Sequence, residues 1–379
     1  MRKSNNHVKN ARAPKRIAKL ALLLAAGLVM SALFGLVHHV HPLYLGKELY
    51  EAGRCALLQS AARAHYDLKL HKTVDAHFCR APAVLDVQGD RVSPLGLAVL
   101  SDLGHELHRF DAAGRLRWVR HFSLQRPTGL AAGGGHLYVS MLNKVKVMNA
   151  QDGREIAELS FSKPVMGLSV SGNLMTLSYR IPGPRSVEVF KVARDFSGVR
   201  SVFVNPHRGV YPRDARLLGR LLIVSDTFGQ RVYAVDTGDA AIRWQYKANY
   251  PYGVSLQGHK LLVSEEHANH ISAFDLSSGV KSIVFGCPRY PFDDPAVAPE
   301  QVDGVATETF ASLRPHDAHP CRMRNAMDVT LYSQGGIDVA GDALLVADTD
   351  NHRVVEFGAS DPRWVAVGFN NPVMAVYVR

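Results

Sequence analysis

Residues Gly336–Gly358 read GIDVAGDALLVADTDNHRVVEFG, and this stretch decides the fold. Apolar and polar residues alternate through short segments of four to six residues, and Gly, Asp and Asn separate the segments. Alternation with a period of two is typical of β-strands, and Gly, Asp or Asn between such segments is typical of tight turns. The stretch therefore predicts consecutive antiparallel strands that are joined by hairpins.

The same pattern recurs along the chain. Its copies open at Gly96 (the weakest), Gly129, Gly167, Asp214, Gly253 and Gly336. From Gly129 the openings follow at 38, 47 and 39 residues, and the last step of 83 residues is one repeat plus an insertion. Four antiparallel strands in a repeat of about 40 residues are typical of a propeller blade. Stacked blades bury the apolar faces that one blade would expose. The sequence therefore predicts an all-β fold, a six-bladed β-propeller.

The two ends of the repeat region predict how the ring closes. Asn371–Arg379, NPVMAVYVR, resembles an opening strand such as Arg126–Ala132. We expect it to add an inner strand to the first blade, because a closed ring leaves no open sheet edge. Ala83–Asp90 also resembles an opening strand, so seven blades are the alternative to six.

The N-terminal part of the chain differs from the repeats. Leu20–Val37 is a run of eighteen uncharged residues, and seven basic residues precede it. A run of this length can cross a bilayer core, and the positive-inside rule leaves the basic end in the cytoplasm. We expect a cytoplasmic tail (1–19), a signal-anchor helix of the inner (plasma) membrane (20–40), a short helical stalk (41–82) and a periplasmic or otherwise extracytoplasmic propeller (83–379). A cleaved signal peptide is the alternative.

The charge of the chain is concentrated near its N-terminus. The formal net charge of +10 falls to +3 when the seven basic residues before the apolar run are left out. A nucleic-acid-binding domain should carry a basic stripe in its folded part, and no such run is visible in the repeats. We therefore do not expect nucleic acid as a partner.

The four cysteines are Cys55, Cys79, Cys287 and Cys321. An even number in an exported chain favours disulfides, and loop-closure entropy favours near neighbours. We expect Cys55–Cys79 and Cys287–Cys321, with four unrelated thiols as the alternative. The second pair would tie together the insertion (287–334). The insertion enters through a linker between blades, so we expect it to cover the face that carries these linkers, as a polar lid.

One copy of the repeat resembles a known family. Val346–Phe357, VADTDNHRVVEF, is similar to the core of the NHL repeat, which takes its name from such an Asn-His turn. Ser225–Asp236 matches the same core, and Val302–Pro315 resembles the linker that NHL proteins place before a blade. The resemblance runs from about Gly96 to the end of the chain. It implies a propeller, but not a chemistry, because unrelated functions share this fold.

The candidate ligand site is one mouth of the central channel. Connections between the second and third strands of a blade lie on the same face as the linkers between blades, and a concave site with converging polar groups is the default place for a ligand. The candidate residues are Arg126, Arg180, Tyr211, Arg213, Asp214, Tyr252, Glu265, His267 and Asp338. Asp226 and Asp348 occupy consensus positions, where a carboxylate accepts backbone N–H bonds, and a structural role is also the alternative for Glu265 and His267.

The leading hypothesis is a membrane-tethered binding or scaffold module for a protein, peptide or glycan, with no catalytic residue. The alternative is a metal-dependent hydrolase or lyase, because six-bladed relatives include lactonases and an amidating lyase. That alternative needs Asp214, Glu265, His267 and Asp338 to converge on a divalent metal at the axis. The segment His316–Cys321, HDAHPC, also has a histidine spacing that fits a metal site, although it lacks a second ligand cluster. No other cofactor is expected.

Overall fold

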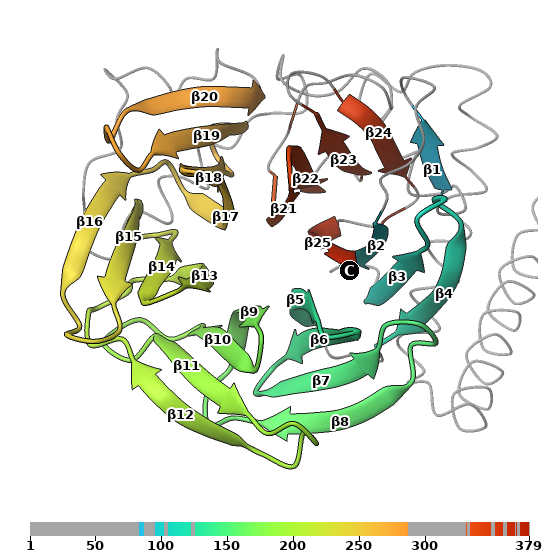
Figure 1. Ribbon diagram of the computed structural model, residues 1–379, viewed down its shortest axis with the longest axis horizontal. Coiled ribbons are helices and arrows are strands. Elements are labelled where there is room, and N and C mark those ends of the chain that lie inside the picture. The colour runs from blue at the N-terminus through green and yellow to red at the C-terminus, as the bar shows by residue number, and fades with distance from the viewer. Residues whose placement is uncertain are drawn as a thin grey trace, which may run out of the picture. The chain divides into compact units, whose positions relative to one another are not determined.

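Six antiparallel sheets surround a central axis in the computed structural model, counted over the residues that it describes (Figure 1). The described residues are 83–86, 95–101, 105–122, 126–286, 331, 334–349, 353–358, 362–367, 369 and 372–378. Five of these sheets have four strands and one has five. The chain is therefore a six-bladed β-propeller, as the spacing of the repeats predicts.

Each blade has the same order of strands from the axis outward. The inner strands are β25 (Pro372–Val378), β5 (Pro127–Gly133), β9 (Val165–Ser171), β13 (Pro212–Leu218), β17 (Pro251–Gln257) and β21 (Ile337–Ala340). The second strands are β2 (Gly96–Ser101), β6 (His136–Met141), β10 (Leu174–Tyr179), β14 (Leu221–Asp226), β18 (Lys260–Glu265) and β22 (Ala343–Asp348). The third strands are β3 (Glu106–Phe110), β7 (Lys144–Asn149), β11 (Val187–Val192), β15 (Arg231–Asp236), β19 (His270–Asp275) and β23 (Arg353–Phe357). The outer strands are β4 (Leu116–His121), β8 (Glu155–Ser160), β12 (Val199–Val204), β16 (Ile242–Lys247), β20 (Lys281–Gly286) and β24 (Pro362–Val367).

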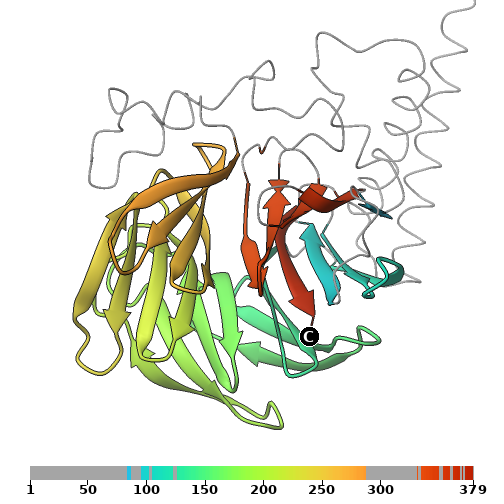
Figure 2. The ribbon, with the colours of Figure 1, turned by 45° about the horizontal axis from the view of Figure 1, so that its top comes forward.

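The C-terminal strand closes the ring. β25 pairs antiparallel with β2, from Gly96 opposite Val378 to Leu100 opposite Met374. Figure 2 shows the red β25 beside the cyan β2. Every residue of β25 is buried. The prediction that the C-terminal segment supplies an inner strand to the first blade is confirmed over Pro372–Val378.

A further strand from the N-terminal side decides the number of blades. β1 (Ala83–Asp86) pairs with β24, with Ala83 opposite Val367 and Asp86 opposite Trp364. It is the fifth and outermost strand of the last blade. The described part of the segment that resembled an opening strand therefore lies at the rim of the ring, and the alternative of seven blades is wrong.

The apolar residues of the repeats form the contacts between blades. Six clusters of buried apolar side chains, among the described residues, lie one between each pair of adjacent blades. In one of them Val187 and Val189 of β11 share a cluster with Leu222 and Val224 of β14. Outer strands such as β4 and β8 are mostly exposed or half-buried, because no further strand covers them. Stability therefore depends on the stacking of neighbouring blades.

The connections between strands form two faces, which we name the loop face and the turn face. The loop face holds the connections from second to third strands and the linkers between blades, described at residues 105, 122, 126, 142–143, 161–164, 180–186, 205–211, 227–230, 248–250, 266–269, 331, 334–336, 349 and 369. The turn face holds the other connections, described at residues 111–115, 134–135, 150–154, 172–173, 193–198, 219–220, 237–241, 258–259, 276–280, 341–342 and 358.

Gly167 lies where two inner strands approach each other closely, which gives a first prediction. A Cβ atom at this position would lie 1.9 Å from the backbone oxygen of Arg213 on the next blade. Backbone cannot move aside as a flexible side chain can, so Gly167→Ala should lower the free energy of unfolding by about 2 kcal/mol in urea melts. Gly198→Ala is the control, because nothing lies within 4 Å of its Cβ. Equal effects of both changes would contradict this account of the inner strands.

Several predictions fall on other parts of the chain. The tail, anchor helix, stalk, all four cysteines and nearly all of the insertion lie outside the described residues. Within the part of the chain that the structure describes, no helix has the length and apolar character needed to cross a membrane.

Candidate functional site

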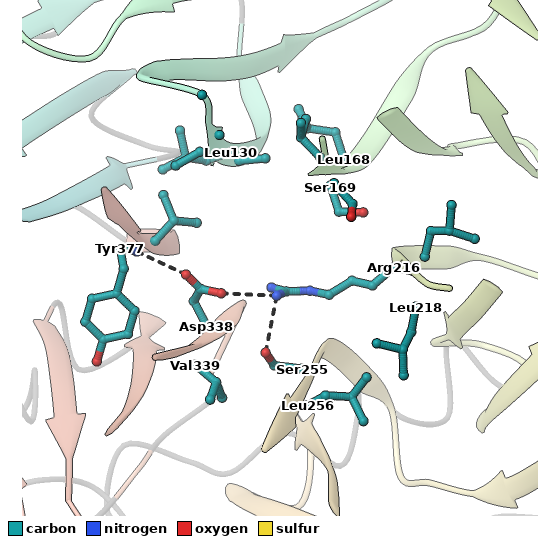
Figure 3. Close-up of a pocket in the computed structure, with 18 residues that line it drawn as sticks. Leu130, Leu168, Ser169, Arg216, Leu218, Ser255, Leu256, Asp338, Val339 and Tyr377 are labelled. Carbon is teal, nitrogen blue, oxygen red and sulfur yellow. Dashed lines mark hydrogen bonds and ion pairs between the residues drawn. The ribbon is translucent and has the colours of Figure 1, made fainter. Parts of the chain in front are cut away.

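A cavity of about 490 Å³ lies on the axis of the ring (Figure 3). The inner strands of all six blades line it, mostly with apolar side chains and glycine. The stretches that line it include Gly133-Gly134, Ser171 and Leu218, at or next to the turn-face ends of their strands. Arg216 and Asp338 are the charged residues of the lining. The cavity therefore has a wall of mixed polarity with one charged centre, and it extends toward the turn face.

Arg216 on β13 reaches across to the next two blades. Its Nη1 donates hydrogen bonds to Ser255 Oγ at 3.2 Å and to Asp338 Oδ1 at 3.1 Å, and its Nη2 donates to the backbone oxygen of Ile337 at 2.6 Å. Its Nε lies 3.6 Å from Asp214 Oδ2. Figure 3 shows the guanidinium between Ser255 and Asp338. One cation thus connects three inner strands and lies between two carboxylates.

The two carboxylates also bind the backbone of neighbouring blades. Asp214 Oδ2 accepts a hydrogen bond from Val254 N at 3.0 Å, and Asp338 Oδ2 accepts one from Tyr377 N at 3.0 Å. Asp214 is only 1% exposed. Burial raises the pKa of the Asp214 carboxyl above its ordinary value, although the Arg216 guanidinium acts in the opposite direction. Both residues therefore join adjacent blades around the axis.

The four residues of the metalloenzyme alternative do not share one open position. Asp214 and Asp338 meet at Arg216, whose guanidinium occupies the place that a cation would take. Glu265 ends β18, and His267 lies in the loop-face connection after it. Among the described residues, no group of three or more His, Cys, Asp or Glu side chains could hold a metal ion. This geometry gives the alternative no support.

Arg213, next to Asp214 in the sequence, is the centre of an aromatic cluster near the loop face. Its Nη1 donates to Glu266 Oε2 at 2.6 Å. The guanidinium carbon lies 4.5 Å from the ring centre of Tyr252, 5.5 Å from that of Tyr250 and 5.7 Å from that of Tyr211. Burial alone would lower the pKa of Arg213, but the Glu266 carboxylate and the neighbouring tyrosines together outweigh burial and raise this pKa. The side chain is therefore a fixed cation held by three aromatic rings.

Further rings extend the cluster between two blades. Phe228 stacks on Tyr211, with ring centres 4.5 Å apart, and lies 5.3 Å from the ring of Tyr250. Tyr250 stacks on His267 at 3.8 Å with nearly parallel planes. Tyr211 and Phe228 are half-buried, whereas Tyr250 and His267 are buried. We call these residues the Arg213 cluster: Tyr211, Arg213, Phe228, Tyr250, Tyr252, Glu266 and His267.

Glu265 has a structural role. Its Oε2 accepts a hydrogen bond from Asn249 N at 2.5 Å, and its Oε1 accepts bonds from Lys281 Nζ at 2.6 Å and from Ser272 Oγ. Asp226, at the same position of the preceding blade, accepts bonds from two backbone N–H groups of its own linker. Both carboxylates therefore hold a linker against its blade.

The buried Glu265 predicts a loss of stability in acid. Burial by itself would raise the pKa of Glu265, but the neighbouring His270 and Lys281 outweigh burial and lower it from 4.5 to about 2. Because the folded-state pKa is depressed, the stabilisation is present above about pH 4.5 and is lost as the pH falls toward 2. Urea melts from pH 7 to pH 2 should show this loss in the parent protein and a flatter pH profile in Glu265→Gln. The same profile in both proteins would contradict this role.

The predicted site residues fall into separate groups. Tyr211, Arg213, Tyr252 and His267 belong to the Arg213 cluster. Asp214 and Asp338 meet at Arg216 by the axis. Arg126 and Arg180 are exposed on the loop face, and Glu265 is buried beneath it. Arg216, Ser255 and Phe228 were not among the site residues predicted from the sequence. One available signal was the spacing of Asp214 and Arg216, since residues two apart on a strand share a face.

Comparisons with known proteins agree with the fold. No family model and no curated protein matches the sequence. A crystal structure of a protein of unknown function from Bacteroides caccae matches with a TM-score of 0.53 at 14% identity, over 76% of this chain and all of that one. A chain of a nidogen/laminin complex matches with a TM-score of 0.51 at 10% identity, over 75% of this chain and 98% of that one. Identities this low support the propeller fold alone.

Proposed function

We propose that this chain is a membrane-tethered propeller of the NHL type that binds a protein partner through its loop face on the extracytoplasmic side of the inner membrane. The Arg213 cluster is the observation that carries the proposal. Arginine and tyrosine dominate the binding energy of many protein interfaces, particularly when the free protein already holds them in place. Here Arg213 is fixed by Glu266 and three tyrosines, and the half-buried Tyr211 and Phe228 remain accessible to a partner.

Site-specific photo-cross-linking in cells tests this surface. A photoreactive phenylalanine analogue at Phe228 should form a cross-linked product with one main partner, identified by mass spectrometry. The control position is Leu218, which is 46% exposed at the turn-face end of β13. Arg213→Ala should lower the yield at Phe228 by about tenfold, as expected for a residue that dominates an interface. Products from Leu218 alone, or a yield that does not respond to Arg213→Ala, would contradict the proposal.

The membrane tether rests on the apolar run Leu20–Val37 and the basic residues before it. An enzyme reporter that is active only outside the cytoplasm, fused after Arg379, should be active in cells. The fusion should also sediment with membranes at its full length, because an anchor is not cleaved. An inactive reporter would contradict the orientation, and a shortened soluble product would favour the cleaved signal peptide.

A further inference from the structure

Positive charges gather on the loop face beside the Arg213 cluster. The described connections of that face hold five basic residues and one acidic residue, and the acidic one is Glu266, already paired with Arg213. The described connections of the turn face hold four basic and five acidic residues. The two faces therefore differ in charge, although the repeat region as a whole is nearly neutral.

Four of the loop-face cations and one at the start of β15 lie on blades β9–β12 and β13–β16, or on the linkers that lead into them. We call them the basic patch: Lys163, Arg180, Arg185, Arg208 and Arg231. Lys163 Nζ donates a hydrogen bond to the backbone oxygen of Arg185 at 2.8 Å. Arg180 N donates to the backbone oxygen of Pro164, the neighbour of Lys163, at 3.0 Å. These three cations therefore belong to one surface.

Backbone contacts join that surface to the next linker. Gly183 and Gly209 exchange two hydrogen bonds, of 2.8 Å and 3.2 Å, between the connection after β10 and the linker before β13. Arg208 precedes Gly209, and its backbone oxygen accepts a hydrogen bond from Arg231 Nη2 at 2.8 Å. The patch is therefore continuous, although its members span 69 residues of sequence, from position 163 to position 231.

Few carboxylates balance these cations. Arg231 pairs with the fully buried Asp226 at 3.4 Å. Within the part of the chain that the structure describes, no carboxylate pairs with Lys163, Arg180, Arg185 or Arg208. Unbalanced like charges on one surface create a field that attracts an oppositely charged partner and speeds its association.

The apolar neighbours of the patch favour a peptide over a polysaccharide. Ile181 is 44% exposed, and Pro182 beside it is also exposed, so aliphatic surface lies among the cations. The ring of Tyr179 is only 1% exposed, and Tyr211 already stacks on Phe228, so these rings offer little face for stacking on sugars. Exposed aliphatic surface among guanidinium groups suits a chain that carries both carboxylates and apolar side chains.

We infer that the basic patch binds an acidic segment of the protein partner, an inference that rests on the proposed loop-face function. Guanidinium groups bind carboxylates in a bidentate geometry, and four arginines in one patch offer several such contacts. The acidic segment would lie across the two linkers, with the partner's apolar residues against Ile181.

Fluorescence anisotropy with the full-length protein in detergent tests the inference, using labelled poly-L-glutamate as the probe. Arg180→Ala/Arg208→Ala should weaken binding by about tenfold, since each exposed ion pair contributes modestly. Arg154→Ala/Arg194→Ala is the matched control: it removes two exposed arginines from the turn face and should change binding less than twofold. Binding should also weaken from 50 to 300 mM NaCl, because salt screens exposed charges.

Each outcome has a distinct meaning. Equal losses in the two double variants would show that net charge alone attracts the probe, which would overturn the inference. Equal or tighter binding of polygalacturonate, a carboxylate polymer without peptide groups, would overturn the choice of a peptide. No binding of polyglutamate together with a cross-linked partner at Phe228 would refute the acidic segment and leave the loop-face function standing. If polyglutamate does not bind and no partner is cross-linked at Phe228, the proposed function is refuted as well.

Discussion

A chain that ends at Asn371, and therefore lacks β25, is expected to lose cooperative unfolding. Val373, Met374, Val376, Tyr377 and Val378 are each at most 9% exposed. Burial of one such side chain contributes about 1.5–3 kcal/mol, so the combined loss is about as large as the 5–15 kcal/mol by which typical domains are stable. The change also leaves β2 with an unpaired inner edge. Circular dichroism during urea or thermal unfolding should show a broad, non-cooperative transition or aggregated protein.

Two controls make this prediction specific to ring closure. Removal of Arg379 alone should leave the transition unchanged, because this residue follows the end of β25. A synthetic peptide of residues 371–379, added to the shortened chain, should restore part of the cooperative transition. A shortened chain that unfolds as cooperatively as the parent would show that β25 does not hold the ring together.

Replacement of Arg216 by Met is expected to destabilise the propeller by about 3–5 kcal/mol at pH 7, the usual cost of leaving buried charges without their partner. Asp214 and Asp338 would then lie in the channel without the guanidinium that compensates both. Without that cation, the pKa of the Asp214 carboxyl, which burial already raises, should rise further. The loss should therefore shrink as the pH falls from 7 to 4, where protonation removes the charge of Asp214. Urea melts at several pH values measure both effects.

A triple variant separates charge from packing at the same site. Arg216→Met combined with Asp214→Asn and Asp338→Asn removes the charges but keeps side-chain oxygens for the N–H groups of Val254 and Tyr377. It should recover most of the lost stability and show little pH dependence. A triple variant as unstable as Arg216→Met alone would mean that the shape of the arginine, and not its charge, supports the inner strands.

The blades could be predicted from the sequence because their cause is local. Alternation of apolar and polar residues fixes which face of a strand is buried, and Gly and Asp mark the turns. Closure by the last strand was predicted from its likeness to the opening strands. The resemblance of Ala83–Asp90 to those strands suggested a seventh blade, because alternation does not distinguish an inner strand from an added rim strand. The pairing of β1 with β24 shows that it is a rim strand.

The site was harder to predict because it depends on how blades are set against each other. Arg216 meets Asp338 across 122 positions of sequence, and no local pattern encodes that contact. The loop-face cations are similarly scattered, so a search for a basic run found none. Some residues of the Arg213 cluster could be predicted, because the order of strands alone places the linkers between blades and the connections from second to third strands on one face. Their contacts with Phe228 and Glu266 required the packing of two blades.

The added strand β1 has a mechanical consequence. A pull on the chain from the N-terminal side of Ala83 is delivered first to the outermost ladder of the last blade, which has four residue pairs. The seam between β25 and β2 has six pairs and is the innermost strand pair of the first blade, near the axis. Under tension, β1 should peel away before the seam opens. Detachment of β1 from β24 would then absorb the strain, while the pairing of β25 with β2 keeps the ring closed.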